Sequence, residues 1–348
     1  MFSTYREKDV KILLKDITGL VKPLGTAERE KLIQSGRHYS EMLPIEYEPS
    51  EKYLKTYFDA LKRYAKITAA AVKSVSEQIF LEKGKKIALV SLARAGTPIG
   101  ILIKHYLEQN FPCEVEHYTI SIIRGVGIDK NAINFILKRH KPSEIQFVDG
   151  WTGKGAIQRE LLQAMKDFPE ISAGLAVLSD PAGISEKFGT HEDFLIASSC
   201  LNSTVSGLLS RTFLRNDIIG EKDFHGAAFY SELREKDLTY QFIDEIEKNF
   251  ADAPEIKKSA VKIGSGLAEV KKIAADFKIS DINLIKPSIG EATRVLLRRL
   301  PWKILVQSLH DENLEHLYQL AEEKGVKVEI YPLKNYKACG LIQKIADN

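Results

Sequence analysis

Short apolar runs alternate along the chain with segments whose apolar residues recur every three or four positions. Runs such as KIALVSL (86–92) and AGLAVLSD (173–180) are typical of buried strands, and the segments between such runs are typical of amphipathic helices. We expect strands over residues 86–92, 114–123, 144–149, 173–180 and 193–199, and helices over 97–109, 131–139 and 155–166. Strands separated by helices of this length predict an α/β fold with a doubly wound parallel sheet.

The pattern changes on either side of this region. A long helix is expected to begin after Ser50, a good helix cap, and an irregular extension with a short helix near residues 28–35 precedes it. After residue 217 the chain becomes charged and helical in pattern, and from residue 281 strand and helix signals alternate again. We therefore divide the chain into an N-terminal extension, a large α/β domain, a helical linking region and a small α/β module: 1–49, 50–217, 218–280 and 281–348.

Composition narrows the function classes. The chain has 348 residues with 50 basic and 47 acidic side chains, so its net charge of +3 gives no global field for nucleic acid. Its three cysteines are far apart and form no CxxC, which favours a reducing compartment over a disulfide framework. No signal peptide and no apolar run of membrane-spanning length is evident. We predict a cytoplasmic protein without membrane contact.

Three loops with unusual chemistry follow predicted strands. They are SLARAGTP (91–98), RGVGID (124–129) and the loop at the start of DGWTGKGAI (149–157). In doubly wound sheets ligands bind at the carboxyl ends of the strands, where such loops meet. The sequence therefore predicts a ligand site built from all three loops.

The third loop has the features of a phosphate site. Small residues let backbone N–H groups converge on an anion, and the following helix N-terminus favours negative charge. Thr152 adds a hydroxyl donor and Lys154 a positive charge. Asp149 would repel a phosphate and suits sugar hydroxyls or a hydrated metal ion better. We therefore predict a ligand that carries a phosphate beside a polyol, such as a ribose phosphate.

Other interpretations of the loop are weaker. The P-loop pattern GxxxxGK[ST] fails because Gly155 follows the lysine, and GxGxxG is not matched. A plain glycine turn without a ligand remains the alternative. Arg94 and Arg124 in the two companion loops make that alternative the less favoured one.

The three loops together resemble a type I phosphoribosyltransferase. The resemblance implies that Asp149 corresponds to the first of two acids and that Arg124 lies in a mobile catalytic lid. It implies catalytic roles for Arg94, Arg124 and Asp149, with Mg²⁺ accompanying phosphoribosyl pyrophosphate (PRPP). The substrate-binding residues that it implies are Gly96, Thr97, Thr152, Gly153, Lys154 and Gly155. Gly150 departs from the pattern, because it stands where that family has its second acid.

Longer motifs give a closer resemblance over nearly the whole chain. They are SIIRGVGIDKNAINFIL, FVDGWTGKGAI, GTHEDFLIASSCLNSTVSGLLSRT, DFHGAAFY and KPSIGEATRVLLRRLPWKILV. These are similar to the tellurite-resistance-associated phosphoribosyltransferase family labelled StiP, sometimes with the words "cysteine protease". The family implies a C-terminal Pelota-type RNA-binding domain and a role in stress-linked synthesis of a nucleoside-like compound.

The hydroxyl-rich stretch SSCLNSTVSG (198–207) follows the last predicted strand and is expected to face the same cleft. We assign Ser203 and Thr204 to ligand binding. Cys200 is the nucleophile that a protease would need, with His191 or His225 as its base. No known cysteine-protease signature surrounds Cys200, and a small buried cysteine is the commoner situation.

The C-terminal module carries a basic cluster. Lys286, Arg294 and Arg298 are candidates for RNA binding, since residues 294 and 298 share a helix face. A solvated helix face is the plainer interpretation. An RNA-binding regulator that senses PRPP or a nucleotide without catalysis is the alternative to an enzyme. The sequence leaves open the acceptor and the oligomeric state, a homodimer included.

Overall fold

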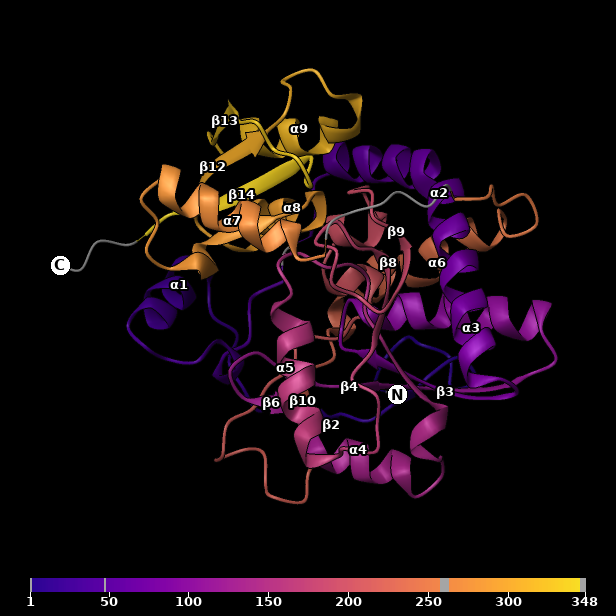
Figure 1. Ribbon diagram of the computed structural model, residues 1–348. Helices are drawn as coiled ribbons and strands as arrows, with labels where there is room; N and C mark the ends of the chain where they lie inside the picture. Colours follow the sequence, from indigo (N-terminus) through magenta and orange to yellow (C-terminus); the bar gives the residue numbers. More distant parts are fainter. Residues whose placement is uncertain (1, 47, 257–262, 345–348) are drawn as a thin grey trace.

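The computed structural model describes residues 2–46, 48–256 and 263–344, which form two α/β units packed against each other (Figure 1). The larger unit is built on a six-stranded sheet and the smaller, C-terminal unit on a four-stranded sheet. In the described residues, no helix combines the length and the apolar character needed to cross a bilayer.

The larger sheet is parallel throughout. Its order is β1 (Lys11–Ile12), β4 (Glu114–Ile120), β3 (Lys86–Leu92), β7 (Ile145–Val148), β8 (Leu175–Ser179) and β9 (Lys187–Thr190). β3 lies near the middle because apolar residues occupy both of its faces. Ile87 and Leu89 pack into one apolar core, and Ala88 and Val90 into another. The predicted doubly wound parallel sheet is confirmed.

Helices cover both faces of this sheet. α2 (Glu51–Lys83), α3 (Gly96–Asn110) and α6 (Thr239–Glu247) contribute to one core, and α4 (Lys130–Leu137) and α5 (Ala156–Ala164) to the other. Ser50 caps α2 as predicted, because its side chain accepts a hydrogen bond from the N–H of Tyr53. The sequence pattern thus located the main layers correctly.

Two strand predictions were wrong in detail. Residues 193–199 form no strand, and the last strand is instead β9, whose polar sequence KFGT hid it. The run DFLIASS is apolar because Phe194, Leu195 and Ile196 pack in the core shared with the C-terminal unit. The expected strand at 114–123 ends at Ile120, after which β5 (Ile122–Ile123) pairs with β6 (Gly127–Ile128) in a small antiparallel hairpin.

The N-terminal extension is more ordered than predicted. Its β1 adds an edge strand to the large sheet, and β2 (Lys15–Asp16) pairs with β10 (Gly226–Ala227). Helix α1 (Thr26–Gln34) lies close to the short helix expected near residues 28–35. The extension therefore wraps around the large domain.

The C-terminal sheet has the order β11 (Ile285–Pro287), β14 (Ala338–Ile342), β12 (Pro301–Val306) and β13 (Lys327–Ile330). Helices α8 (Ile289–Arg298) and α9 (Glu315–Glu323) pack on the large domain. α7 (Ser265–Asp276) packs in a separate core with β11 and β14. The region 218–280 is thus divided, since α6 packs on the large domain and α7 on the small one, while residues 257–262 lie outside the described residues.

One apolar core joins the two units. It runs from α2, with Tyr53 and Tyr57, into α8 and α9, with Leu296 and Leu317. Figure 1 shows the orange and yellow C-terminal unit against the end of α2. Burial of this extent fixes α8 against the larger domain, above the carboxyl ends of its strands.

Candidate functional site

A cleft of about 380 Å³ lies where the two units meet. The loops after β3 and β7 form its floor, α1 and residues 39–46 form one wall, and α8 with β11 forms another. Three parts of the chain that are far apart in sequence therefore build one cavity. The sequence predicted the two loops as parts of a site, but it did not predict the α1 wall or the role of α8.

The lining of the cleft is strongly cationic. Nine of its residues are basic and three are acidic. The basic residues are Arg29, Arg94, Arg124, Lys154, Arg211, Lys286, Arg294, Arg298 and Arg299, and the acidic ones are Glu46, Asp149 and Glu291. Since buried cations are costly unless compensated, such an excess favours a ligand with several negative charges.

The loop after β3 brings Arg94 to the cleft. The peptide bond between Ala93 and Arg94 is cis. The Arg94 guanidinium bonds to Glu46 at 3.1 Å and to the carbonyl of Leu209 at 2.7 Å. Gly96 needs to be glycine, because a Cβ there would lie 2.5 Å from the carbonyl oxygen of Val148. The loop is thus held close against the end of β7.

Thr97 lies away from the cleft. Its hydroxyl is buried and shares a hydrogen bond of 2.7 Å with the hydroxyl of Thr119. It was assigned to substrate binding with Gly96, yet it does not line the cavity. The cause is helical geometry, since Thr97 lies in the first turn of α3 and faces β4.

Asp149 follows β7 and lines the cleft. Burial raises the pKa of its carboxyl to about 6, and the N–H of Gly150 and the nearby Arg294 guanidinium oppose that rise. Asp149 is therefore mostly ionised at neutral pH, although burial leaves its carboxylate poorly solvated. A carboxylate in that state gains much from a cation or from hydroxyl donors.

The side chains of Thr152 and Lys154 have protein partners. The Thr152 hydroxyl donates to the buried carboxylate of Asp180. The Lys154 ammonium donates to the carbonyls of Ile282 and Ile285 in the C-terminal unit. Burial lowers the pKa of Lys154 to about 7, with Lys286 and Arg124 adding to the effect. These bonds hold the loop in place, and the phosphate-binding role of both side chains stays a prediction.

Backbone groups of the same loop remain available. Within the described residues, the N–H groups of Gly153, Lys154 and Gly155 donate to no protein acceptor. Gly155, at φ +78°, turns the chain into α5. Convergent N–H groups ahead of a helix N-terminus form an anion site that needs no side chain.

The loop between β5 and β6 carries Arg124. The backbone N–H of Arg124 donates to the Tyr39 hydroxyl at 2.8 Å, and its carbonyl oxygen lies 3.0 Å from Nε2 of His38. The guanidinium lies 3.2 Å from Oδ1 of Asn283. This loop is therefore held between the N-terminal segment and the C-terminal unit. At its end Asp129 caps α4, because its side chain accepts a hydrogen bond from the N–H of Ala132.

Helix α8 adds two functional side chains to the cleft. The Arg294 guanidinium lies 3.6 Å from a carboxylate oxygen of Glu291 and 4.4 Å from the centroid of the Trp151 ring. Its Nε is buried and has no partner in the described residues. Glu291 also lies against the phosphate loop, since a Cβ on Gly153 would be 3.4 Å from its Cγ. The sequence offered no signal for Glu291 except its helical spacing of three from Arg294.

The basic cluster of the C-terminal module faces inward. Lys286, Arg294 and Arg298 all line the cleft, and Arg298 bonds to Asn202 of the large domain. Burial lowers the pKa of Lys286 to about 8. The plainer interpretation, a solvated helix face, is therefore wrong, and the assignment of these three residues to RNA binding stays a prediction.

The hydroxyl-rich stretch is mainly structural. Ser203 and Thr204 are buried, and neither lines the cleft. Cys200 is fully buried in the core between α2 and α8, and burial raises the pKa of its thiol to about 12. His191 bonds to the carbonyl of Asp180 and His225 to Ser121. Among the described residues, Cys200 has no histidine partner, so the arrangement lacks an activated thiol.

Comparison with known proteins gives two family matches. Residues 3–247 match the family model described as "Tellurite-like stress resistance cysteine protease StiP", and residues 264–344 match the "PELOTA RNA binding domain". The chain is 36% identical over 365 residues to "Cysteine protease StiP" of Acinetobacter baylyi, an alignment that covers 98% of this chain and 94% of that protein.

Parts of the chain also align with solved phosphoribosyltransferases. A hypoxanthine-guanine phosphoribosyltransferase of Bacillus anthracis aligns at 16% identity and a TM-score of 0.27, over 36% of this chain and 76% of that chain. The hypoxanthine phosphoribosyltransferase of Trypanosoma cruzi with its product IMP aligns at 12% identity and a TM-score of 0.26, over 53% and 93%. At these TM-scores the alignments decide nothing about the site.

Proposed function

The chain belongs to the StiP family of tellurite-like stress resistance proteins, with a C-terminal Pelota domain, and on this premise we propose that its cleft binds PRPP as the donor in a phosphoribosyl transfer. The observation that carries the proposal is the excess of nine basic over three acidic residues around a cavity of about 380 Å³. A sugar with a phosphate and a pyrophosphate supplies the missing negative charge. The cavity volume lies within the range of small-molecule sites.

Each loop of the cleft binds a different part of PRPP. The free N–H groups of Gly153 to Gly155 receive the 5-phosphate, with Lys286 beside them. Arg94 and Arg294 face the pyrophosphate, and Arg124 closes over it. Guanidiniums already in place stabilise the charge that builds up on the leaving group, and closure excludes water from the cation that forms at the anomeric carbon.

Glu291 supplies the carboxylate that Gly150 lacks. Asp149 and Glu291 come from different units, yet the charge of Glu291 is close enough to raise the pKa of Asp149, and Arg294 lies near both. Two carboxylates on one side of the cleft fit the two hydroxyls of a ribose or the water shell of Mg²⁺. Bound with PRPP, Mg²⁺ would neutralise part of the pyrophosphate charge, and Asp149 and Glu291 would hold it through water.

The Acinetobacter baylyi relative is named a cysteine protease. In this chain the surroundings of Cys200 do not support such a thiol-based activity. A buried thiol with a raised pKa and no base is a poor nucleophile at neutral pH. The Pelota match favours RNA as a partner of the C-terminal unit, on a face other than the cleft side of α8. RNA binding is thus compatible with the transferase and does not replace it.

Release of pyrophosphate separates an enzyme from a sensor. The full chain is incubated with PRPP, MgCl₂ and a set of nucleobases, amines and phosphorylated acceptors, and free pyrophosphate is measured. Acceptor-dependent release is expected, and it is lost in Asp149→Asn. Binding of PRPP without release by any acceptor would identify a sensor.

A further inference from the structure

Two arginines of the cleft, Arg29 and Arg211, lie near each other at the end formed by α1. Arg29 of α1 is 5% exposed, and its buried Nε has no partner in the described residues. Arg211 follows the hydroxyl-rich stretch and stacks its guanidinium on Tyr39, at 4.6 Å from the ring centroid. Across the residues that the structure describes, no carboxylate lies within ion-pair distance of either side chain.

Two neighbouring arginines, unlike Arg29 and Arg211, each pair with an acid. Arg299 forms a two-pronged pair with Glu30, at 2.7 and 2.9 Å, and Arg94 pairs with Glu46. Arg29 is left facing Arg299, and Arg211 faces Arg29 and Arg94. Burial and these like charges lower the pKa of Arg29, and they lower that of Arg211 to about 9. Glu30 and Glu46 offset part of this effect at Arg29, although neither forms an ion pair with it. Two guanidiniums this close, one buried and one half-buried, are unfavourable unless an anion binds between them.

We propose that Arg29 and Arg211 form a second anion subsite, separate from the phosphate loop, which holds a phosphate or carboxylate of the acceptor. The inference rests on the proposed function, because it names the acceptor of that reaction as a small anionic molecule. The backbone donors of Gly153 to Gly155 come from the loop after β7, whereas these two arginines come from α1 and from the segment after residue 207. Arg94 lies beside Arg211, so the two subsites adjoin, as a transfer between bound donor and acceptor requires.

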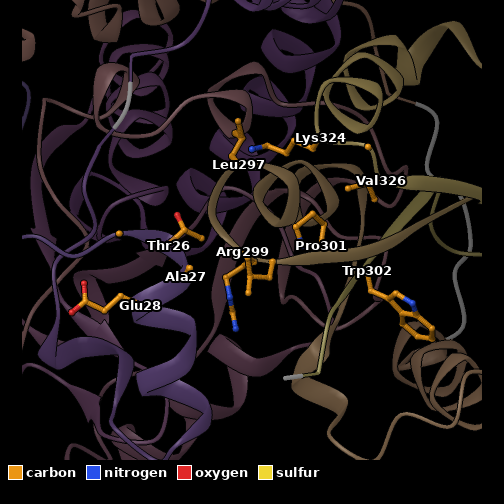
Figure 2. A pocket seen from close by; sticks show the side chains of 12 residues that line it. Thr26, Ala27, Glu28, Leu297, Arg299, Pro301, Trp302, Lys324 and Val326 are labelled. Atoms are coloured by element: carbon orange, nitrogen blue, oxygen red, sulfur yellow. The ribbon is translucent and has the colours of Figure 1, made fainter. Parts of the chain in front are cut away.

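A groove leads to this end of the cleft. It has a volume of about 750 Å³ and shares Thr26, Leu297 and Arg299 with the cleft. Figure 2 shows Arg299 reaching toward α1 between Thr26 and Pro301, with Lys324 and Trp302 farther along the groove. Thr26 lies one turn before Arg29 on α1. The groove therefore gives a small molecule a route to Arg29 that does not pass the phosphate loop.

The test uses inorganic phosphate as the probe and the full chain. Phosphate affinity is measured by calorimetry, first alone and then with PRPP and MgCl₂ at saturation. The variants are Arg29→Met and Arg211→Met, and the matched control is Arg139→Met, a change at an exposed arginine in the turn after α4. We expect phosphate to bind in the presence of PRPP, and each variant to lose about tenfold or more in phosphate affinity. PRPP affinity should change by less than about threefold.

Stability gives a second readout, which also settles whether a variant has folded. Removing one of two neighbouring positive charges should raise the melting temperature of both variants in phosphate-free buffer, whereas loss of a structural contact would lower it. Phosphate binding that PRPP abolishes, or equal phosphate affinity in the parent and both variants, would overturn the second subsite. A parent that binds phosphate through Arg29 and Arg211 but never binds PRPP would refute the proposed donor and leave the subsite standing.

Discussion

The guanidinium of Arg294 lies 4.4 Å from the centroid of the Trp151 ring, so a side chain of the C-terminal unit covers the loop that follows β7. Trp151 belongs to the predicted phosphate loop, and Arg294 to the helix predicted to face RNA. Their contact shows that the cleft is complete only when both units are in place. It also couples the cleft to an optical probe, because Trp151 and Trp302 are the two tryptophans of the chain.

Replacing Arg294 should weaken PRPP binding. In a Trp302→Phe background Trp151 is the sole tryptophan, and its fluorescence should change as PRPP and MgCl₂ are added. We expect Arg294→Gln to weaken binding by about tenfold or more, since it removes a buried cation from the pyrophosphate side. Arg63→Gln, on exposed α2 surface, should bind as the parent does. Unchanged affinity in Arg294→Gln would remove α8 from the site.

Lys154 should contribute to folding stability, by an amount that depends on pH. Its folded pKa of about 7 is below that of an unfolded lysine, so its contribution to stability is present at high pH and is lost as pH falls through 7. Lys154→Met leaves two buried carbonyls without their donor, which should cost about 1–3 kcal/mol at pH 9. Because the parent pays for burying the charge at low pH, the difference should shrink at pH 6.

Urea unfolding of Lys154→Met at the two pH values checks this. Lys130→Met removes an exposed lysine paired with Asp167 and should have little effect at either pH. A loss of stability in Lys154→Met that is the same at pH 6 and pH 9 would refute the assigned cause.

Asp193 of the larger unit bonds to the C-terminal unit, and its contribution to stability should depend on pH. Its carboxylate accepts hydrogen bonds from the N–H groups of Ile289, at the start of α8, and of Lys337. Burial raises its pKa to about 7, above that of an unfolded aspartate. Its favourable contribution is therefore complete below about pH 4 and is lost as pH rises through 7.

Asp193→Asn should flatten that part of the stability profile. Melting temperatures measured from pH 5 to 8 should fall less steeply in the variant than in the parent, because asparagine keeps an acceptor oxygen without the charge. Asp217→Asn, a change at an exposed carboxylate that pairs with Arg215, should keep the slope of the parent. Parallel profiles for the parent and Asp193→Asn would show that another group sets the pH dependence.

Cys200 should be unreactive in the folded protein. With a thiol pKa of about 12 it holds almost no thiolate at neutral pH, and its burial blocks access. Iodoacetamide should label the half-buried Cys113 first, while Cys200 and Cys339 become labelled only after unfolding. Peptide mass mapping before and after urea distinguishes the sites. Rapid labelling of Cys200 in the native protein would revive a thiol-based activity.

The sequence predicted what local patterns encode. Apolar runs located the central strands, and glycines after β3 and β7 marked the loops at the floor of the cleft. The family motifs, confirmed by the matches over residues 3–247 and 264–344, covered most of the chain. The polar strand β9 was not predicted. Lys187 and Thr190 are residue types that are usually exposed, but both are buried in the structure.

The rest depended on how the units pack. A lysine after a glycine turn reads as a phosphate ligand, and only the folded chain shows Lys154 donating to carbonyls of another unit. A basic helix reads as an RNA-binding surface until the core of α2, α8 and α9 turns Arg294 inward. Arg29 lies in no motif. Only the structure shows that it is buried without an ion-pair partner in the described residues.

Calorimetric titration of the full chain with PRPP and MgCl₂ at pH 8 tests the central claim most directly. The parent should bind PRPP, and Asp149→Asn and Glu291→Gln should each weaken binding by about tenfold or more and reduce its dependence on Mg²⁺. Glu315→Gln, an exposed change in the same C-terminal unit, should bind as the parent does. No binding by the parent, or equal binding by all four proteins, would contradict a ribose-phosphate site shared by the two units.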